Sequence, residues 1–242
     1  MIRFRQLHDT ASGAFTYLLA DAASGEALII DPVLEHIILY LGLIDELQSR
    51  LTYVLETHVH EDHATAGARL RASCGAKVVY SRTSGVRWAD LLVSDGDTVA
   101  LGQERIDVRA TPGHTRGCVS YLWRDRLFSG DALLIGGCGR TDLPDSNAGQ
   151  LYDSLTRRIL TLPDETLVYP GRDNGGRRVT CIGEEREHNP CVTGRTRDEF
   201  VAGMARLDPG RASLSEASLP RPGIRFASRA ATQFSRGSLP SR

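Results

Sequence analysis

The stretch THVHEDH, from Thr57 to His63, is the most informative part of this 242-residue sequence. It holds three of the chain's seven histidines and two acidic residues, and it directly follows the apolar run LTYVLE. Imidazole and carboxylate groups gathered where a strand gives way to a loop suit zinc, iron or manganese. The helical metalloprotease arrangement is excluded, because it needs two histidines at i and i+4 on one helix face. The stretch therefore predicts a metal site, with a polar surface turn as the alternative.

Two later segments place further candidate ligands at the ends of predicted strands. TPGHTRGC puts His114 after one strand, and LFSGDALL puts Asp131 at the end of another. Alone, either residue would be interpreted as part of a surface turn. Together with the histidine loop they bring nitrogen and oxygen ligands from three strand ends, as a metal site at the edge of a sheet sandwich requires.

The order of the predicted elements favours mixed sheets. Period-two and short apolar runs predict strands, and longer runs with helical spacing predict helices. The strands FTYLLAD and EALIIDP form a predicted hairpin, and CVSYLWRDRLFSGDALL predicts two strands around Arg124 and Asp125. The remaining predicted strands are LTYVLE, KVVY, ERIDVRATPGH and TLVYPGR, and the predicted helices are EHIILYLGLIDELQ, ATAGARLRASCG and SNAGQLYDSLTRRILTLPD. Hairpins exclude a purely doubly wound parallel sheet, so two mixed sheets covered by helices are expected.

Composition narrows the class of protein. With 41% hydrophobic residues, 24% charged residues and a net charge of -1, the chain is typical of globular proteins and offers no electrostatic reason to bind nucleic acid or anionic lipid. No apolar run approaches the roughly 20 residues of a membrane-spanning helix, and the first residues lack a secretory signal, so a cytoplasmic location is expected. Five cysteines without CxxC spacing argue against a disulfide framework or a structural zinc knot.

The HxHxDH loop followed by a distant histidine and then an aspartate resembles the metallo-β-lactamase superfamily, whose fold is α+β, a four-layer αββα sandwich. Within it, VLETHVHEDHATAGARLR, TPGHTRGC, FSGDALLIGGCGRTD and VTCIGEEREHNP are similar to the persulfide dioxygenases. The similarity runs from about Phe4 to about Met204. GCGRTD, residues 137–142, discriminates best, because thioester hydrolases of the glyoxalase II type share the histidine loop but usually lack this segment.

The resemblance implies one ferrous ion, Fe(2+), per chain, held by His58, His114 and Asp131. Two histidines and one carboxylate leave positions open on iron for substrate and dioxygen. The family reaction oxidises glutathione persulfide with dioxygen and water to sulfite and glutathione, so an iron-dependent dioxygenase for this or a similar low-molecular-weight persulfide is expected. A homodimer and a functional link to a rhodanese are partners to consider, although no motif indicates either.

The resemblance also suggests roles for neighbouring residues. His60, Asp62 and His63 would orient the ligands or tune the charge at the metal. Arg140 would meet an anionic group of glutathione or the persulfide, with an ordinary surface arginine as the alternative. Cys138 would lie near the site as an inert thiol or a redox-sensitive one.

The segment YPGRDNGG departs from the family pattern. Relatives of both kinds normally carry a histidine where Arg172 stands, and many dioxygenases carry a tyrosine where Asn174 stands. Arginine has no lone pair for a metal and stays protonated, so one metal is favoured over two. Arg172 could instead contact an anionic substrate or weaken the enzyme, and Asn174 marks a place where a contact in relatives could be missing.

Two rival functions and one domain boundary complete the expectations. The first rival is a glyoxalase II-like hydrolase of glutathione thioesters, and the second is a non-catalytic member that keeps a metal for stability or for sensing persulfide. Residues 1–206 are expected to form the metallo-β-lactamase-like catalytic domain. Residues 207–242 are rich in Ser, Arg, Pro and Gly and predict a flexible tail, with a basic docking arm as the alternative.

Overall fold

Strands and helices alternate along the chain in the computed structural model, which describes residues 1–172 and 175–207. The first half contains β1 (Ile2–His8), β2 (Phe15–Asp21), β3 (Glu26–Ile30), the 3₁₀ turn η1 (Leu34–His36), α1 (Ile37–Glu46), β4 (Arg50–Leu55), α2 (Gly67–Cys74), β5 (Lys77–Ser81), the 3₁₀ turn η2 (Arg82–Ser84) and β6 (Leu91–Val93). The second half contains β7 (Thr98–Leu101), β8 (Glu104–Ala110), β9 (Val119–Trp123), β10 (Arg126–Gly130), β11 (Leu133–Leu134), β12 (Gly137–Cys138), α3 (Ala148–Ser154), the π-helical turn η3 (Leu155–Ile159), β13 (Leu167–Pro170), β14 (Thr180–Cys181), α4 (Ile182–His188) and α5 (Arg197–Leu207).

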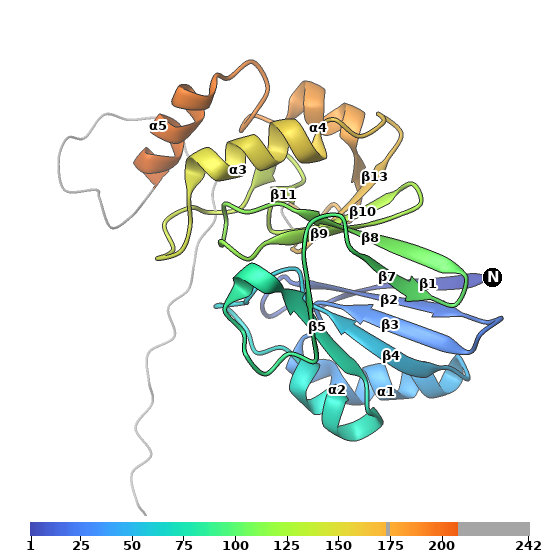
Figure 1. Cartoon of the computed structure of the whole chain (residues 1–242). Coiled ribbons are helices and arrows are strands. Elements are labelled where there is room, and N and C mark those ends of the chain that lie inside the picture. The colour runs from blue at the N-terminus through green and yellow to red at the C-terminus, as the bar shows by residue number, and fades with distance from the viewer. Residues whose placement is uncertain (173–174, 208–242) are drawn as a thin grey trace, which may run out of the picture. The chain divides into compact units, whose positions relative to one another are not determined.

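The longer strands form two mixed sheets. The first has the order β1-β2-β3-β4-β5-β6, antiparallel from β1 to β3 and parallel from β3 to β6. The second has the order β14-β13-β10-β9-β8-β7, in which β10 and β13 pair in parallel. Helices α1 and α2 cover the outer face of the first sheet, and α3, α4 and α5 lie on the outer side of the second (Figure 1). The predicted four-layer αββα sandwich is therefore confirmed.

Local sequence signals explain several of these elements. The predicted hairpin is β2 and β3, with Tyr17 opposite Ile30. Helix α2 ends at Gly75, whose φ of 73° lies in the left-handed region that glycine enters without steric cost. Between β9 and β10 the loop has two residues, Arg124 and Asp125, and Arg124 adopts the positive φ of 54° that tight hairpins require.

The sequence did not predict the edge strands. β1 and β6 border the first sheet, and β14 and β7 border the second. Edge strands are often short or carry charged side chains, which limits pairing with other chains and weakens the apolar pattern. β1 illustrates this, because IRFRQLH alternates between half-buried and exposed positions in its first half.

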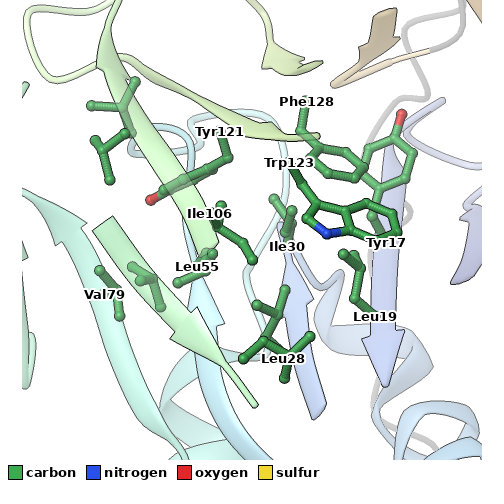
Figure 2. Close-up of a cluster of buried hydrophobic side chains, with 14 of the residues drawn as sticks. Tyr17, Leu19, Leu28, Ile30, Leu55, Val79, Ile106, Tyr121, Trp123 and Phe128 are labelled. Atoms are coloured by element: carbon green, nitrogen blue, oxygen red, sulfur yellow. The ribbon is translucent and has the colours of Figure 1, made fainter. Parts of the chain in front are cut away.

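The main core lies between the two sheets. Inward-facing side chains of both sheets pack together there, as Figure 2 shows for Tyr17, Leu28, Ile30, Tyr121 and Phe128. A second cluster joins the first sheet to α1 and α2, and a third joins the second sheet to the C-terminal helices. The three clusters hold the four layers together through burial of apolar surface.

Replacing Leu28 with alanine tests the importance of the central cluster. Leu28 lies on β3 and is fully buried, so its truncation should lower the free energy of unfolding by about 2–5 kcal/mol in a urea titration. Ile38 is 78% exposed on α1, and the matched change Ile38→Ala should cost less than about 0.5 kcal/mol. Equal losses in the two variants would contradict this placement of the core.

Two further predictions concern the C-terminal tail and membrane-spanning helices. Helix α5 runs to Leu207, and the remainder of the predicted tail lies outside the described residues. Among residues 1–172 and 175–207, no helix is both long and apolar enough to cross a membrane.

Candidate metal centre

Three strand ends bring the predicted ligands together. His58 follows β4 of the first sheet, whereas His114 follows β8 and Asp131 follows β10 of the second. All three side chains are buried, and one potential ligand atom from each lies within 4.8 Å of the others. Gly130 makes this approach possible, because a Cβ there would lie 2.6 Å from the hydroxyl oxygen of Thr57. The two sheets therefore meet at this edge with no room for a side chain between them.

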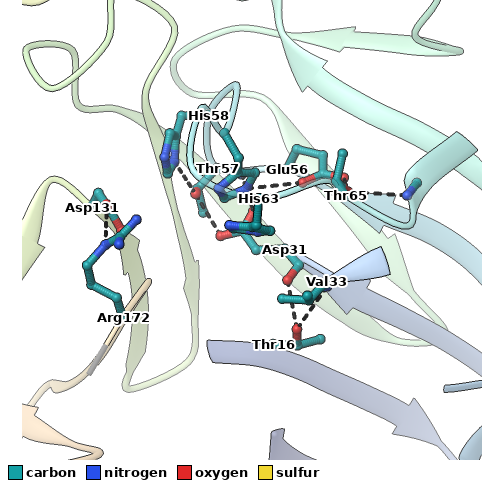
Figure 3. A network of polar contacts seen from close by, with 12 residues as sticks. Thr16, Asp31, Val33, Glu56, Thr57, His58, His63, Thr65, Asp131 and Arg172 are labelled. Carbon is teal, nitrogen blue, oxygen red and sulfur yellow. Dashed lines mark hydrogen bonds and ion pairs between the residues drawn. The ribbon is translucent and has the colours of Figure 1, made fainter. Parts of the chain in front are cut away.

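Hydrogen bonds fix the orientation of both imidazole rings. The Thr57 hydroxyl donates its one proton to Asp31 Oδ2 at 2.7 Å, so its oxygen must accept from His58 Nδ1 at 2.9 Å (Figure 3). His114 Nδ1 donates to the carbonyl oxygen of Arg140 at 2.9 Å. Each ring therefore keeps the lone pair of Nε2 free, and a neutral imidazole with its other nitrogen engaged in this way is the usual state of a histidine ligand.

The charge states of the ligands suit a metal ion. Burial, and then the neighbouring His60 and His114, hold the pKa of His58 well below its usual value, so the ring is neutral at physiological pH. Asp131 supplies a buried carboxylate, of which Oδ2 lies 3.8 Å from His114 Nε2. Two imidazoles and one carboxylate that converge on one point match the donor set of non-haem ferrous sites. The residues present therefore fit the iron that the sequence predicts.

His60 lies beside His58, with ring centroids 4.2 Å apart, and its Nε2 faces two carboxylates. Its Nε2 lies 3.3 Å from Asp31 Oδ1 and 3.4 Å from Glu56 Oε2. Burial opposes protonation of the ring, but the two carboxylates outweigh it and raise the pKa of His60 well above its usual value. Asp31 also accepts from the Thr57 backbone at 2.7 Å, so a chain of polar contacts connects His60 to Thr57 beside His58. His60 also belongs to two further groups that could hold a metal ion, one with Asp62 and His63 and one with Asp31 and Glu56.

Arg172 bridges two carboxylates at the edge of the site. Its Nε donates to Asp131 Oδ2 at 2.7 Å (Figure 3). Its Nη2 donates to Asp62 Oδ2 at 3.0 Å. Burial lowers the pKa of Arg172, but both carboxylates more than offset this, so the guanidinium stays charged. His63 Nδ1 lies 3.2 Å from Asp62 Oδ1 in the same group. A fixed cation thus occupies the place beside Asp62 and His63 where a second metal would need ligands.

The other predicted site residues lie at different distances from this centre. The guanidinium of Arg140 pairs with Asp142 and is 62% exposed, while its backbone carbonyl holds His114. Cys138 is half-buried on β12, which pairs with β11 just after Asp131. Asn174 lies outside the described residues. Arg140 therefore contributes to the centre through the bond between its backbone carbonyl and His114. A backbone contact of this kind cannot be predicted from the type of side chain.

Three buried polar residues of the centre were not predicted from the sequence. Asp31, Glu56 and Thr57 are all less than 3% exposed. Asp31 also adopts a positive φ of 48°, which is uncommon for a residue other than glycine and often marks a constrained functional position. An aspartate directly after the apolar run EALII was the available signal, because a charged residue at the end of a buried strand needs a partner.

Thr57→Val should weaken metal binding without removing a ligand. Valine keeps the shape of threonine but loses the bond to Asp31 and the acceptor for His58 Nδ1. Loss of such an orienting contact typically lowers metal affinity by about 10–100-fold. Competition with a chromophoric chelator measures this, and Thr52→Val, whose hydroxyl bonds an exposed carbonyl, is the control. Unchanged affinity in Thr57→Val would contradict the orienting role.

Comparison with known proteins identifies the family of this chain. The model of the metallo-beta-lactamase superfamily matches residues 9–172. The chain is 45% identical over 210 residues to the mitochondrial persulfide dioxygenase ETHE1 of Homo sapiens, covering 86% of this chain and 82% of that protein. It is 36% identical to a hydroxyacylglutathione hydrolase of Rhodospirillum rubrum, over 67% of this chain and 63% of that protein.

A solved structure of an ETHE1 protein is also similar to this chain. The crystal structure of ETHE1 from Myxococcus xanthus is 51% identical in sequence and superposes with a TM-score of 0.83, covering 91% of this chain and 93% of that one. The predicted resemblance is confirmed at the level of the family by these matches. The chain belongs to the persulfide dioxygenase family within the metallo-β-lactamase superfamily.

Proposed function

We propose that this protein is an iron-dependent persulfide dioxygenase that oxidises glutathione persulfide, or a similar low-molecular-weight persulfide, with dioxygen and water to sulfite and the thiol. The observation that carries the proposal is the set of His58, His114 and Asp131, whose donor atoms converge at a buried point. Membership of the persulfide dioxygenase family supports the reaction class.

The chain's own residues would prepare the centre for this chemistry. When bound, a ferrous ion would supply redox chemistry with dioxygen and a position for the sulfur of the substrate. Thr57 and the Arg140 carbonyl hold the two rings so that both Nε2 atoms face the same point. Arg172 holds Asp131 by a hydrogen bond, which fixes the carboxylate before any ligand arrives. Burial of all three ligand side chains keeps bulk water away from the reacting atoms.

The position of Arg172 supports one ion per chain. A second divalent ion would need Asp62 and His63, and it would lie beside a guanidinium that already bonds to Asp62. Repulsion between the two cations opposes its binding. Because the guanidinium of Arg172 already bonds to two carboxylates of the protein, we propose that Arg172 positions Asp131 and does not contact the substrate. Arg140 is the better candidate to bind an anionic group of the thiol carrier, because its side chain is largely exposed. To do so, its guanidinium would need to release only Asp142.

A cleft beside the histidine loop offers room for the carrier of the persulfide. Its volume is about 190 Å³, and its lining includes Val59 and Glu61 from the loop and Thr115 and Arg116 after His114. The cleft is thus built from the residues that flank two of the three predicted ligands. Its size suits part of a small thiol, which supports a low-molecular-weight carrier.

The proposed function is tested by measuring oxygen consumption with persulfide and thioester cleavage without oxygen on the same protein preparation. Iron-loaded protein should consume dioxygen when glutathione persulfide is added and should form sulfite. Under argon it should leave S-lactoylglutathione intact. Thioester cleavage without oxygen, and no oxygen uptake with persulfide, would identify the hydrolase instead. The cytoplasmic location, the homodimer and the rhodanese link stay predictions.

A further inference from the structure

Two cysteines from distant parts of the chain meet at the edge of the second sheet. Cys138 lies on β12, and Cys191 lies in the turn after α4. Their thiols are within hydrogen-bonding reach of each other. Both side chains are half-buried, and both pack against the cluster beneath α3 and α5. Neither residue is needed by the metal centre as described above.

Asn189 holds the two segments in this arrangement. Its Nδ2 donates to the carbonyl oxygen of Gly137 at 2.9 Å, and its Oδ1 accepts from the backbone of Cys191 at 2.9 Å. Glu185 adds to the clamp, because its carboxylate accepts from Asn189 at 2.8 Å and from the backbone of Gly136 at 3.0 Å. Asn189 and Glu185 are both buried. The contact between the cysteines is therefore built into the fold by a buried network.

The two thiols differ in reactivity. The hydrogen bond from the Cys138 thiol, and to a smaller extent the charge of Arg195, lower the pKa of Cys191, although burial opposes this. The same bond raises the pKa of Cys138 for as long as Cys191 is a thiolate. Cys191 is thus the better nucleophile, and Cys138 lies next to it as a resolving thiol.

The pair lies close to the proposed reaction site. Cys138 precedes Gly139, where a Cβ would lie 2.3 Å from the backbone oxygen of Asp131 and 2.9 Å from the Cβ of His114. Cys138 is therefore one residue away from a position that packs against two of the predicted ligands.

We propose that Cys138 and Cys191 form a persulfide-reactive dithiol, a second site of sulfur chemistry beside the metal centre. Cys191 thiolate attacks the terminal sulfur of a low-molecular-weight persulfide, the sulfur–sulfur bond of the donor breaks, and the donor leaves as a thiolate that takes the Cys138 proton. Cys138 then attacks the sulfur of Cys191, a disulfide forms, and hydrosulfide is released. Two protein thiols are oxidised, and the transferred sulfur is reduced, so no other oxidant is needed.

This inference takes its oxidant from the substrate class of the proposed function, but the step uses neither metal nor dioxygen. The experiment is therefore done on the iron-loaded full chain under argon, where oxygenation cannot proceed. Glutathione persulfide, prepared from glutathione and elemental sulfur, is added in excess, and the protein is analysed by non-reducing peptide mass spectrometry. We expect a Cys138–Cys191 cross-linked peptide, release of hydrosulfide, and reversal by dithiothreitol.

Three variants make the test decisive. Cys138→Ser should stop after the first step and carry one extra sulfur atom on Cys191, whereas Cys191→Ser should leave Cys138 unmodified. Cys74→Ser, which removes a half-buried thiol on α2, should still form the cross-link. Wild-type protein without the cross-link, or with sulfur distributed equally over all its cysteines, would overturn the proposal. Because the readout is anaerobic, either result is independent of whether the protein oxidises persulfide in air.

Discussion

Asp131→Asn should abolish persulfide oxidation and release most of the bound iron. Asparagine keeps the size of aspartate but loses the charge that a ferrous ion and Arg172 both require at this buried position. A ligand contributes more than the orienting contacts around it, so the rate of oxygen uptake should fall by more than about 100-fold. Iron content by elemental analysis and oxygen uptake by electrode, measured on the same sample, check this result.

Asp125→Asn is the matched control for this change. Asp125 lies just before β10, whereas Asp131 lies just after it, and the side chain of Asp125 is more than half exposed. Its replacement should leave both iron content and oxygen uptake at the wild-type level. If Asp131→Asn kept its iron and its activity while the far-ultraviolet circular dichroism was native, Asp131 would not be a ligand.

Gly139→Ala should disrupt the centre although Gly139 has no side chain to contribute. The new Cβ would lie 2.3 Å from the backbone oxygen of Asp131, a distance that non-bonded atoms do not adopt, so β12 or the ligands must move. A shift of about 1 Å at a catalytic site can cost about 100-fold in rate. The added methyl group should also lower the free energy of unfolding by about 1–3 kcal/mol. Urea titration, iron content and oxygen uptake measure the three effects.

Gly42→Ala gives the comparison for the same chemical change. Gly42 lies within α1, and a Cβ there meets nothing within 4 Å. Alanine favours a helix over glycine by about 0.5–1 kcal/mol, so this variant should be slightly more stable and fully active. Wild-type activity and iron content in Gly139→Ala would show that the tight packing around His114 and Asp131 is unnecessary.

The sequence predicted the strands that precede His58, His114 and Asp131 because strands depend on local patterns. His58, His114 and Asp131 each follow an apolar run, and the strand end alone places such a residue at the rim of a sheet. Two-residue hairpins and a glycine stop after α2 are equally local signals. Strands, tight hairpins and helix ends are each determined by short segments of sequence, so they can be predicted without knowing which strands pair.

The supporting contacts could not be predicted because they join distant residues. Asp31 bonds to Thr57 across two strands of the first sheet, and Arg172 reaches both Asp62 and Asp131 from a third part of the chain. The sequence predicted that Arg172 could not be a ligand, but only the fold reveals its carboxylate partners. The meeting of Cys138 and Cys191 likewise depends on how α4 packs beside β12, which no motif records.

The pairing of Arg172 also gives a physical reason for the departure from the family pattern. Asp62 and Asp131 hold the guanidinium of Arg172, a fixed charge that cannot be lost at physiological pH. His58, His114 and Asp131 form a fully buried donor group, whereas the neighbouring group of His60, Asp62 and His63 lies beside the guanidinium of Arg172, which bonds to Asp62. This charge supports the proposed single ion with open positions, an arrangement that would suit dioxygen activation better than hydrolysis by a metal pair.

Iron titration of metal-free protein counts the ions that the metal centre needs for activity. Ferrous ion is added stepwise under argon, and each sample is then assayed in air for sulfite formed from glutathione persulfide. We expect the rate of sulfite formation to rise linearly with added iron and to stop rising at about one iron per chain. Zinc-loaded protein should form no sulfite. A rate that keeps rising to two irons per chain, or sulfite formation with zinc, would contradict a mononuclear ferrous centre at His58, His114 and Asp131.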